Sequence, residues 1–301
     1  MSNKNKWTAE NIVSQKGKTI IVTGSSSGIG YEAARVLANK GAKVIIAVRN
    51  LEKGNKAKEK ILIQNKNAAV EVMIVDLSDL SSVKLFAEKF KNNFDKLDVL
   101  INNAGVMIPP YSKTKDGFEL QFGTNHLGHF SLTLQLLDLI EKTPNSRIVN
   151  VASSAHKYGN IDFEDLTWEK RKYSAWRAYG DSKIANLYFT KELAKKLAGK
   201  DILVTAAHPG WTATDLQRHS WVFEFLNQFF AMKQEQGALP TLRAALDETA
   251  NSGDYFGPDG WQERRGYPII VQPNTLAKDE TIAKKLWAVS EELTNVKFKL
   301  N

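Results

Sequence analysis

An apolar run, three spaced glycines and an amphipathic stretch follow one another near the start of this chain. Residues 19–22 predict a buried strand, and residues 31–39 predict a helix. The turn between them contains the pattern Gly-x-x-x-Gly-x-Gly. Gly24 permits a tight turn, Gly28 lets an anionic group approach the backbone, and Gly30 lets the helix pack close to the strand. Since a helix N-terminus attracts negative charge, this order of elements predicts a phosphate-binding turn.

Short apolar segments alternate with longer amphipathic segments along the rest of the chain. We expect further strands at residues 43–48, 70–75, 97–101, 147–151 and 202–207, and further helices at residues 51–66, 80–93, 117–140, 176–197 and 276–293. Such alternation is typical of a parallel sheet covered by helices on both faces. The sequence therefore predicts an α/β fold, a single Rossmann-type doubly wound parallel sheet of about seven strands, with ligands at the C-terminal ends of the strands.

Tyr179 and Lys183 are four residues apart in a predicted helix, so their side chains should leave the same helical face one turn apart. Free tyrosine titrates near about pH 10, and lowering its pKa to roughly 7 requires about 4 kcal/mol in favour of the phenolate. A neighbouring ammonium in a partly dry cleft supplies much of that free energy. We therefore expect Lys183 to lower the pKa of Tyr179.

Four more motifs follow strand ends or begin helices. They are Asn102-Asn103-Ala104-Gly105, Asn125 within Asn-His-Leu-Gly-His-Phe, Ser153 after an apolar strand, and Pro209-Gly210. Together with the glycine turn and the Tyr179/Lys183 pair, they make the chain resemble the short-chain dehydrogenase/reductase family from about Lys16 to the C-terminus. Residues 47–50, 155–156 and 178–186 most resemble the retinol dehydrogenase and WW-domain oxidoreductase branch.

The resemblance implies four catalytic residues. Tyr179 would exchange a proton with the substrate oxygen while hydride passes to or from a nicotinamide, and Lys183 would also bond the nicotinamide ribose. Ser153 would donate a hydrogen bond to the substrate oxygen, and Asn125 would hold a water that links Lys183 to solvent. Ser154 offers a second hydroxyl at the same strand end, but the family pattern favours Ser153.

The end of the second strand bears on the choice of nucleotide. An acid there accepts hydrogen bonds from the adenine ribose in NAD-selective proteins, whereas this chain has Arg49, whose planar guanidinium suits a 2′-phosphate. We expect NADP rather than NAD. Alternatives are a surface role for Arg49 and a helix N-cap role for Asp76. The expected cofactor residues are Gly24, Ser26, Ser27, Gly28, Ile29, Gly30, Arg49, Asp76, Leu77, Asn103, Ala104, Gly105, Tyr179, Lys183, Pro209, Gly210, Thr212 and Thr214.

Two aromatic-rich segments point to the substrate. Twenty-six positions separate Ser153 from Tyr179, and this insert, expected to flank the substrate cleft, contains Phe163, Trp168, Tyr173 and Trp176. Trp211 and the aromatic stretch 221–230 lie where the family places a substrate lid, here residues 211–240. Apolar walls predict a small lipophilic alcohol, aldehyde or ketone. The competing interpretation is that residues 221–230 form an amphipathic helix that docks on a membrane surface or a partner chain.

Bulk composition narrows the functional classes. The alternating pattern indicates one domain over residues 1–301, with residues 1–15 as an N-terminal extension. The net charge is +8, from 41 Lys and Arg against 33 Asp and Glu, but the lysines are spread over several predicted helices. That spread favours a solvated surface over a nucleic-acid site. Residues 1–18 are polar and contain no apolar segment of signal-peptide or membrane-span length, so we expect a soluble cytoplasmic protein.

The sequence gives little sign of metal chemistry. It has no cysteine, and His126 and His129 lack a third ligand nearby in sequence, so we expect no metal site. Predicted helices 117–140 and 176–197 would suit a helix-to-helix homodimer. The leading prediction is an NADP-dependent oxidoreductase. The alternatives are a nucleotide-binding scaffold or sensor that acts mainly through partner binding, and an isomerase or epimerase that uses bound NAD.

Overall fold

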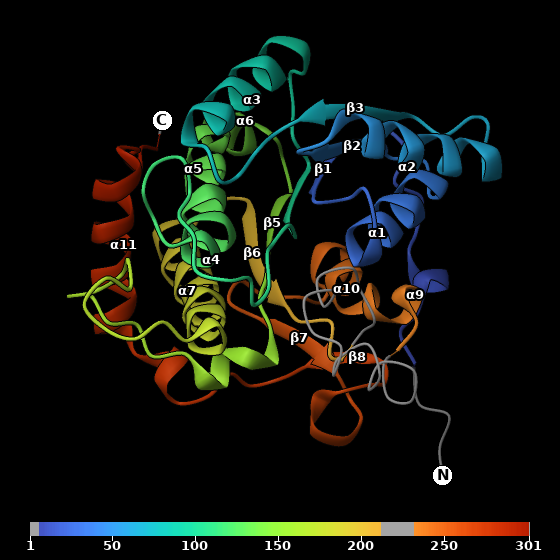
Figure 1. The fold of residues 1–301 in the computed structure, drawn as a ribbon. Helices are drawn as coiled ribbons and strands as arrows, with labels where there is room; N and C mark the ends of the chain where they lie inside the picture. The colour runs from blue at the N-terminus through green and yellow to red at the C-terminus, as the bar shows by residue number, and fades with distance from the viewer. Residues whose placement is uncertain (1–5, 212–231, 301) are drawn as a thin grey trace.

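The computed structural model describes residues 6–211 and 232–300, and a single eight-stranded sheet forms its centre (Figure 1). The strand order is β3-β2-β1-β4-β5-β6-β7-β8, with every neighbouring pair parallel except β7 and β8. The strands are β1 Thr19–Thr23, β2 Lys43–Val48, β3 Val70–Ile74, β4 Val99–Asn102, β5 Ser146–Val151, β6 Ile202–Ala207, β7 Tyr255–Pro258 and β8 Pro268–Ile270. The predicted parallel α/β sheet of about seven strands is confirmed.

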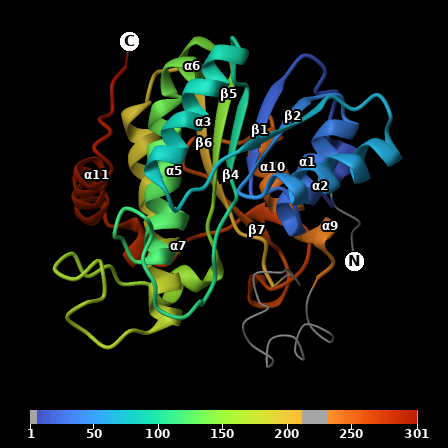
Figure 2. The same ribbon diagram turned by 45° about the horizontal axis from the view of Figure 1, so that its top comes forward.

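Helices cover both faces of the sheet, as Figure 2 shows. One face carries α1, α2 and α10, and the other carries α3, α5 and α7. The helices are α1 Gly28–Asn39, α2 Leu51–Gln64, α3 Leu80–Asn93, α4 Leu120–Phe122, α5 Gly128–Gln135, α6 Leu137–Lys142, α7 Ala175–Lys196, α9 Gln234–Gly237, α10 Leu239–Leu246 and α11 Glu280–Thr294.

The core has two main layers because successive strand side chains point to opposite faces. In β1, Ile20 and Val22 pack with α1 and α10, whereas Ile21 packs with α3 and α5. Strands β2, β4 and β5 divide in the same way. Burial on both faces explains why these strands are nearly continuous apolar runs, and the parallel register brings their C-terminal ends to one edge.

The predicted helix 117–140 is divided in the structure. It begins at Leu120, and between α4 and α5 the residues Gly123–Leu127 form a π-helical turn in which the N–H of Gly128 bonds the carbonyl of Gly123. A Cβ atom on Gly128 would lie 2.4 Å from the carbonyl oxygen of Leu77. The helix can therefore approach the loop before α3 only because this position is glycine.

The C-terminal helix α11 packs along α7 and covers part of the surface expected for a dimer (Figure 1). Its Trp287, 5 % exposed, lies with its ring centre 5.1 Å from that of Phe130 in α5 and 5.9 Å from that of Phe189 in α7. The predicted helix 276–293 begins at Glu280, where Asp279 caps the first turn. A homodimer through this face of α5 and α7 would require α11 to move.

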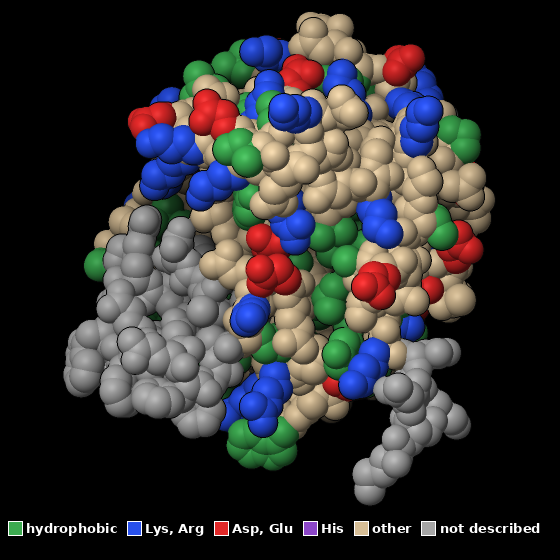
Figure 3. All heavy atoms as spheres, turned by 90° about the vertical axis from the view of Figure 1, so that its right-hand side faces the viewer, with side chains coloured by type: hydrophobic (Ala, Val, Ile, Leu, Met, Phe, Trp, Pro, Cys, Tyr) green, Lys and Arg blue, Asp and Glu red, His purple; other side chains and the backbone are tan. Residues whose placement is uncertain are grey.

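The described part of the N-terminal extension docks on the end of α1. Ile12 is buried, Lys40 Nζ donates to its carbonyl at 2.6 Å, and the N–H of Gln15 donates to the Lys40 carbonyl at 2.8 Å. Among residues 6–211 and 232–300, none of the helices has the length and apolar character needed to cross a bilayer. Figure 3, which views the side of α1 and α2, shows Lys and Arg interspersed with Asp and Glu.

Candidate active site

The glycine turn joins the end of β1 to the first turn of α1. Gly24 and Gly28 adopt positive φ values of 66° and 62°, which glycine accommodates without strain. A Cβ atom on Gly24 would lie 2.8 Å from Ala104 Cα, and one on Gly30 would lie 2.4 Å from Asn103 Nδ2. Ser27 stands at the N-cap without a side-chain hydrogen bond to the first turn. The first N–H groups of α1 therefore lack a side-chain cap and suit an anion.

A buried hydroxyl ties this turn to the segment after β4 and to the π-helical turn. Thr23 Oγ1 accepts hydrogen bonds from the N–H groups of Asn103 and Ala104, both at 2.9 Å. It also lies 2.9 Å from His129 Nε2, while His129 Nδ1 lies 3.0 Å from the carbonyl oxygen of Asn125. Because a carbonyl only accepts, these partners assign the proton to Nδ1 and make Nε2 an acceptor for the Thr23 hydroxyl.

The imidazole of His129 in this network is neutral, because burial lowers its pKa to about 4. Sequence reasoning treated His129 only as a candidate metal ligand and gave Thr23 no role. A hydroxyl residue at the last position of a strand, directly before the glycine turn, was the available signal. The other histidine of the pair, His126, has its Nε2 2.9 Å from Ser290 Oγ of α11.

Asn125 lies in the π-helical turn and is fully buried. Its Oδ1 accepts from the N–H of Val106 at 2.8 Å, and its Nδ2 donates to the Val106 carbonyl at 3.0 Å and to Ser182 Oγ at 2.9 Å. A Cβ atom on Gly105 would lie 3.0 Å from Asn125 Oδ1 and 3.6 Å from Lys183 Nζ. The structure thus brings Asn125, Gly105 and Lys183 together.

Ser153, Tyr179 and Lys183 meet at the end of β5. Ser153 lies close enough to the phenol of Tyr179 to act on its pKa, and its Oγ accepts from the N–H of Ala155 at 3.1 Å. Lys183 Nζ donates to the Val151 carbonyl at 3.1 Å and lies 5.6 Å from the centre of the Tyr179 ring. Tyr179 and Lys183 are 7 % and 4 % exposed. The predicted helical spacing therefore places both side chains in one buried site.

The electrostatics of the pair differ from the prediction. Burial raises the pKa of Tyr179 to about 12, and the hydrogen bond from Ser153 opposes that shift without reversing it. Burial also lowers the pKa of Lys183 to about 8. The expected lowering of the phenol pKa is not found in this structure, because burial disfavours the phenolate more strongly than Ser153 favours it.

The residues that we expected to contact the adenosine part of the cofactor fall into two groups. Arg49 is exposed after β2, and its guanidinium makes no hydrogen bond or ion pair with the described residues. Asp76 is already engaged, since its Oδ1 accepts from the N–H and Oγ of Ser78 at 2.9 and 2.6 Å. Leu77 is buried in the core against Gly128. Arg49 is available to an anionic ligand, whereas Asp76 and Leu77 have evident packing and turn-forming roles.

The Pro209-Gly210 segment after β6 is held by the loop of residues 260–266. The N–H of Trp211 donates to the Arg264 carbonyl at 2.7 Å, and a Cβ atom on Gly210 would lie 2.6 Å from the same oxygen. Buried His208 places its Nε2 3.0 Å from Glu263 Oε2. Sequence reasoning missed this supporting loop, because nothing in the local pattern relates it to the end of β6.

The expected lid is only partly visible. Thr212, Thr214 and the aromatic stretch 221–230 lie outside the described residues, so the lid over residues 211–240 stays a prediction. At its described ends, the N–H of Met232 donates to the Trp211 carbonyl at 2.9 Å.

Several aromatic residues of the insert before α7 pack within the protein. Trp168 is 6 % exposed, with the Arg171 guanidinium 3.7 Å from its ring centre. Phe163 packs against buried apolar side chains of α7 and α11, with Lys285 Nζ 4.5 Å from its ring centre. Trp176, which lies in the first turn of α7, is 43 % exposed.

Comparison with known proteins agrees with this geometry. A model of the short chain dehydrogenase family matches residues 18–223. Retinol dehydrogenase 12 of Mus musculus is 44 % identical over 289 residues, which cover 94 % of this chain and 88 % of its own length. Retinol dehydrogenase 13 of Homo sapiens is 42 % identical over 291 residues, 93 % of this chain and 85 % of its own length.

Solved structures share the fold. An uncharacterised protein from Mycobacterium paratuberculosis superposes with a TM-score of 0.83 at 42 % identity, covering 98 % of this chain and 100 % of that chain. A short chain dehydrogenase from Shigella flexneri, solved in complex with NADP, gives a TM-score of 0.65 at 24 % identity over 80 % of this chain and 96 % of that chain. The chain thus belongs to the short-chain dehydrogenase family of nicotinamide-dependent oxidoreductases, in the branch of the retinol dehydrogenases.

Proposed function

We propose that this protein is an NADP(H)-dependent oxidoreductase that interconverts a lipophilic alcohol and the corresponding aldehyde or ketone. The observation that carries the proposal is the buried contact of Ser153 with Tyr179, one helical turn from Lys183. The site lies at the C-terminal edge of a parallel sheet, near the glycine turn. A protein that only binds nucleotide has no physical need of a buried phenol and ammonium at this place.

The glycine turn and the segment of residues 103–105 fit a dinucleotide. The uncapped first turn of α1 suits the pyrophosphate. The two segments lie so close together that a Cβ atom on Gly24 would collide with Ala104, and one on Gly30 with Asn103. When bound, the nicotinamide supplies or accepts the hydride. Lys183 and the Pro209-Gly210 segment would hold its ribose and ring.

In the reductive direction, Tyr179 would act as the general acid. With a pKa of about 12 the phenol is protonated at neutral pH, so it can donate its proton to the substrate oxygen as the carbonyl is reduced. The Ser153 hydroxyl would hydrogen-bond the same oxygen and stabilise its developing charge. Lys183, next to Asn125 and Gly105, would supply positive charge beside the phenolate that forms.

Arg49 supports NADP over NAD. Its guanidinium, unpaired among the described residues, stands at the end of β2 where an acidic residue would repel a 2′-phosphate. The Shigella flexneri neighbour was solved with NADP, which is consistent with this choice. The relatives are named for retinol, a lipophilic alcohol, so retinol and retinal belong in a substrate panel beside simpler aliphatic and aromatic compounds.

The test measures turnover of that panel with NADPH and NADH, and in the reverse direction with NADP and NAD. We expect Tyr179→Phe to lower kcat/KM by a factor of about 100 or more, because a positioned general acid contributes about 10²–10⁴-fold. The Kd for NADPH, measured by nucleotide fluorescence, should stay close to that of the parent. Nucleotide binding without turnover of any alcohol or carbonyl compound would favour the scaffold or sensor instead.

A further inference from the structure

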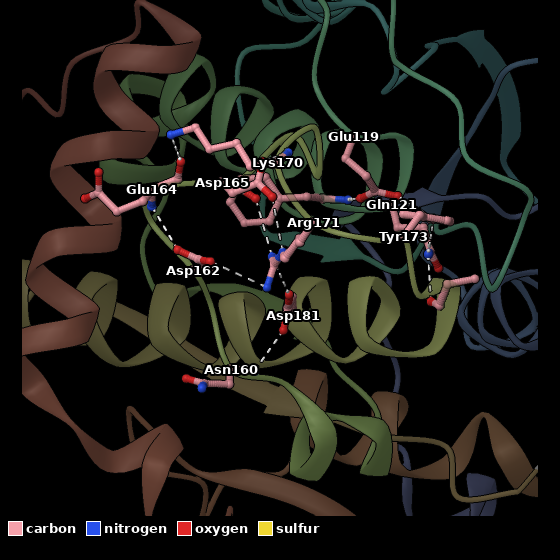
Figure 4. Close-up of polar contacts among 12 residues, drawn as sticks. Glu119, Gln121, Asn160, Asp162, Glu164, Asp165, Lys170, Arg171, Tyr173 and Asp181 are labelled. Atoms are coloured by element: carbon pink, nitrogen blue, oxygen red, sulfur yellow. Dashed lines mark hydrogen bonds and ion pairs between the residues drawn. The ribbon is translucent and has the colours of Figure 1, made fainter.

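We propose that Gln121 and Tyr173 form a brace that fixes the loop of residues 106–113 and so determines which substrates fit the site. The specificity part of this inference rests on the proposed oxidoreductase function. The brace consists of three side chains from two parts of the chain: Glu119 and Gln121 at the start of α4, and Tyr173 at the end of the insert that precedes α7 (Figure 4).

The loop begins in the catalytic site. Asn125 holds both the N–H and the carbonyl of Val106, and a Cβ atom on the preceding residue, Gly105, would lie 3.6 Å from Lys183 Nζ. Residues 106–109 are partly exposed, so they are accessible to a ligand beside these groups. A displacement of this loop would therefore change the space next to the reacting atoms.

Ile108 in this loop has a strained backbone. Its φ is 54°, in the left-handed region that a β-branched residue rarely adopts. Such a conformation persists only where neighbouring groups hold it. Here the N–H of Ile108 donates to Gln121 Oε1 at 2.8 Å. Gln121 is fully buried, so this bond is protected from water.

The orientation of the Gln121 amide is set by its other partners. Its Nε2 donates to Tyr173 Oη at 3.0 Å and to the Ala175 carbonyl at 2.9 Å, which uses both amide hydrogens and leaves the oxygen for Ile108. Tyr173 Oη in turn donates to Glu119 Oε1 at 2.9 Å. Glu119 is fully buried, and its Oε2 accepts from the N–H of Phe122 at 2.7 Å.

The insert also contacts the loop directly. Tyr111 Oη donates to the Thr167 carbonyl at 3.0 Å, the rings of Tyr111 and Tyr173 lie 5.0 Å apart, and Lys113 pairs with Glu169. Most aromatic residues of the insert are used in packing. Through these contacts with the loop of residues 106–113, the insert can still affect the substrate cleft.

The insert is itself anchored to the catalytic helix. Arg171 lies 3.7 Å from Asp181 Oδ2, and the N–H of Asn160 donates to Asp181 Oδ1 at 2.7 Å (Figure 4). Asp181 is two residues beyond Tyr179, so the brace and the catalytic tyrosine share one rigid support.

Two matched variants test the brace. Tyr173→Phe keeps the ring contacts but removes the hydroxyl that orients Gln121, whereas Tyr111→Phe removes a hydroxyl from the same aromatic pair without touching Gln121. For Tyr173→Phe we expect kcat/KM for the largest carbonyl compound relative to the smallest to change by about tenfold, chiefly through KM, because a buried amide loses a partner. The Kd for NADPH should be unchanged. Tyr111→Phe removes only an exposed contact with the Thr167 carbonyl, so it should change the ratio much less than Tyr173→Phe does.

Hydrogen exchange gives a readout that does not depend on turnover. The amide of Ile108 should exchange faster in Tyr173→Phe than in Tyr111→Phe, with similar exchange in β1 of both variants. A lower Tm with an unchanged substrate ratio and unchanged exchange at Ile108 would overturn the brace. If the parent protein turns over none of the compounds, the proposed function and the specificity role both fail, while the exchange comparison still decides whether the brace holds the loop.

Discussion

Burial acts in opposite directions on the pKa values of Tyr179 and Lys183, and in both residues it favours the neutral side chain. The phenol is therefore protonated at neutral pH, and the Lys183 ammonium is close to its own pKa. A pair of groups one turn apart on a helix does not by itself produce an acidic phenol. The surrounding protein determines how unfavourable the charged form of each group is in free energy.

The titration of Lys183 should make stability depend on pH. Its pKa is about 8 in the folded chain against 10.5 for an ordinary lysine, so between these values the unfolded chain binds more protons and the free energy of unfolding rises with pH. Relative to Lys183→Met, the parent should gain about 2 kcal/mol between about pH 7 and 10. Urea unfolding of both proteins measures this gain. A difference independent of pH would contradict the burial of the ammonium.

The helices near the site are shaped by close packing at particular glycines. The π-helical turn Gly123–Leu127 places Asn125 against Val106, and it lies directly before Gly128, where α5 meets the loop before α3. Such π-turns are often associated with functional sites. The His129 ring in α5 lies 3.0 Å from the Asn125 carbonyl in the π-helical turn, so the two segments are linked. A displacement of α5 would therefore also displace Asn125.

Gly128→Ala tests this packing. Its Cβ would lie 2.4 Å from the backbone oxygen of Leu77, which cannot move cheaply, so we expect a loss of about 3 kcal/mol in the free energy of unfolding and reduced turnover. The matched variant is Gly199→Ala, where φ is +84° but no atom lies within 4 Å. That change should cost only about 1–2 kcal/mol and leave turnover intact. Equal losses by urea unfolding would argue against the packing explanation.

At the scale of the whole molecule, the proposed nucleotide site joins segments that are distant in the chain. The glycine turn, the segment after β4 and the π-helical turn are connected through Thr23 and His129. Ligand binding to the folded state alone raises the free energy of unfolding by mass action. Nucleotide should therefore stabilise the complete fold rather than one loop.

NADP at roughly 100 times its Kd should add about 2.7 kcal/mol to the free energy of unfolding. Arg49→Asp should remove most of this stabilisation at the same NADP concentration and leave that from NAD nearly unchanged, because only NADP carries the 2′-phosphate. Lys60→Asp, an equal charge change at an exposed position on α2, is the control. Thermal unfolding with each nucleotide measures the effect. Equal losses for both nucleotides in Arg49→Asp would contradict the assignment of NADP.

The sequence predicted β1 to β6 to within a few residues, but not β7 and β8, the last two strands along the chain. The short strands Tyr255–Pro258 and Pro268–Ile270 contain proline or glycine and have too few residues for a clear period. The interruption of the helix 117–140 was readable only in part, from Gly123 and Gly128. The local sequence around these two glycines does not show which neighbouring segment each of them must approach.

By itself, the sequence determined the first six strands along the chain, the position of the glycine turn and the residues that stand at the strand ends, because periodicity and motif spacing are local properties. The tertiary structure alone decided the pKa directions of Tyr179 and Lys183, the cover of α5 and α7 by α11, and the hold of Gln121 on Ile108. These depend on which distant segments meet: Thr23 and His129, in contact at 2.9 Å, are 106 residues apart. Burial and partner geometry exist only once such segments have packed together.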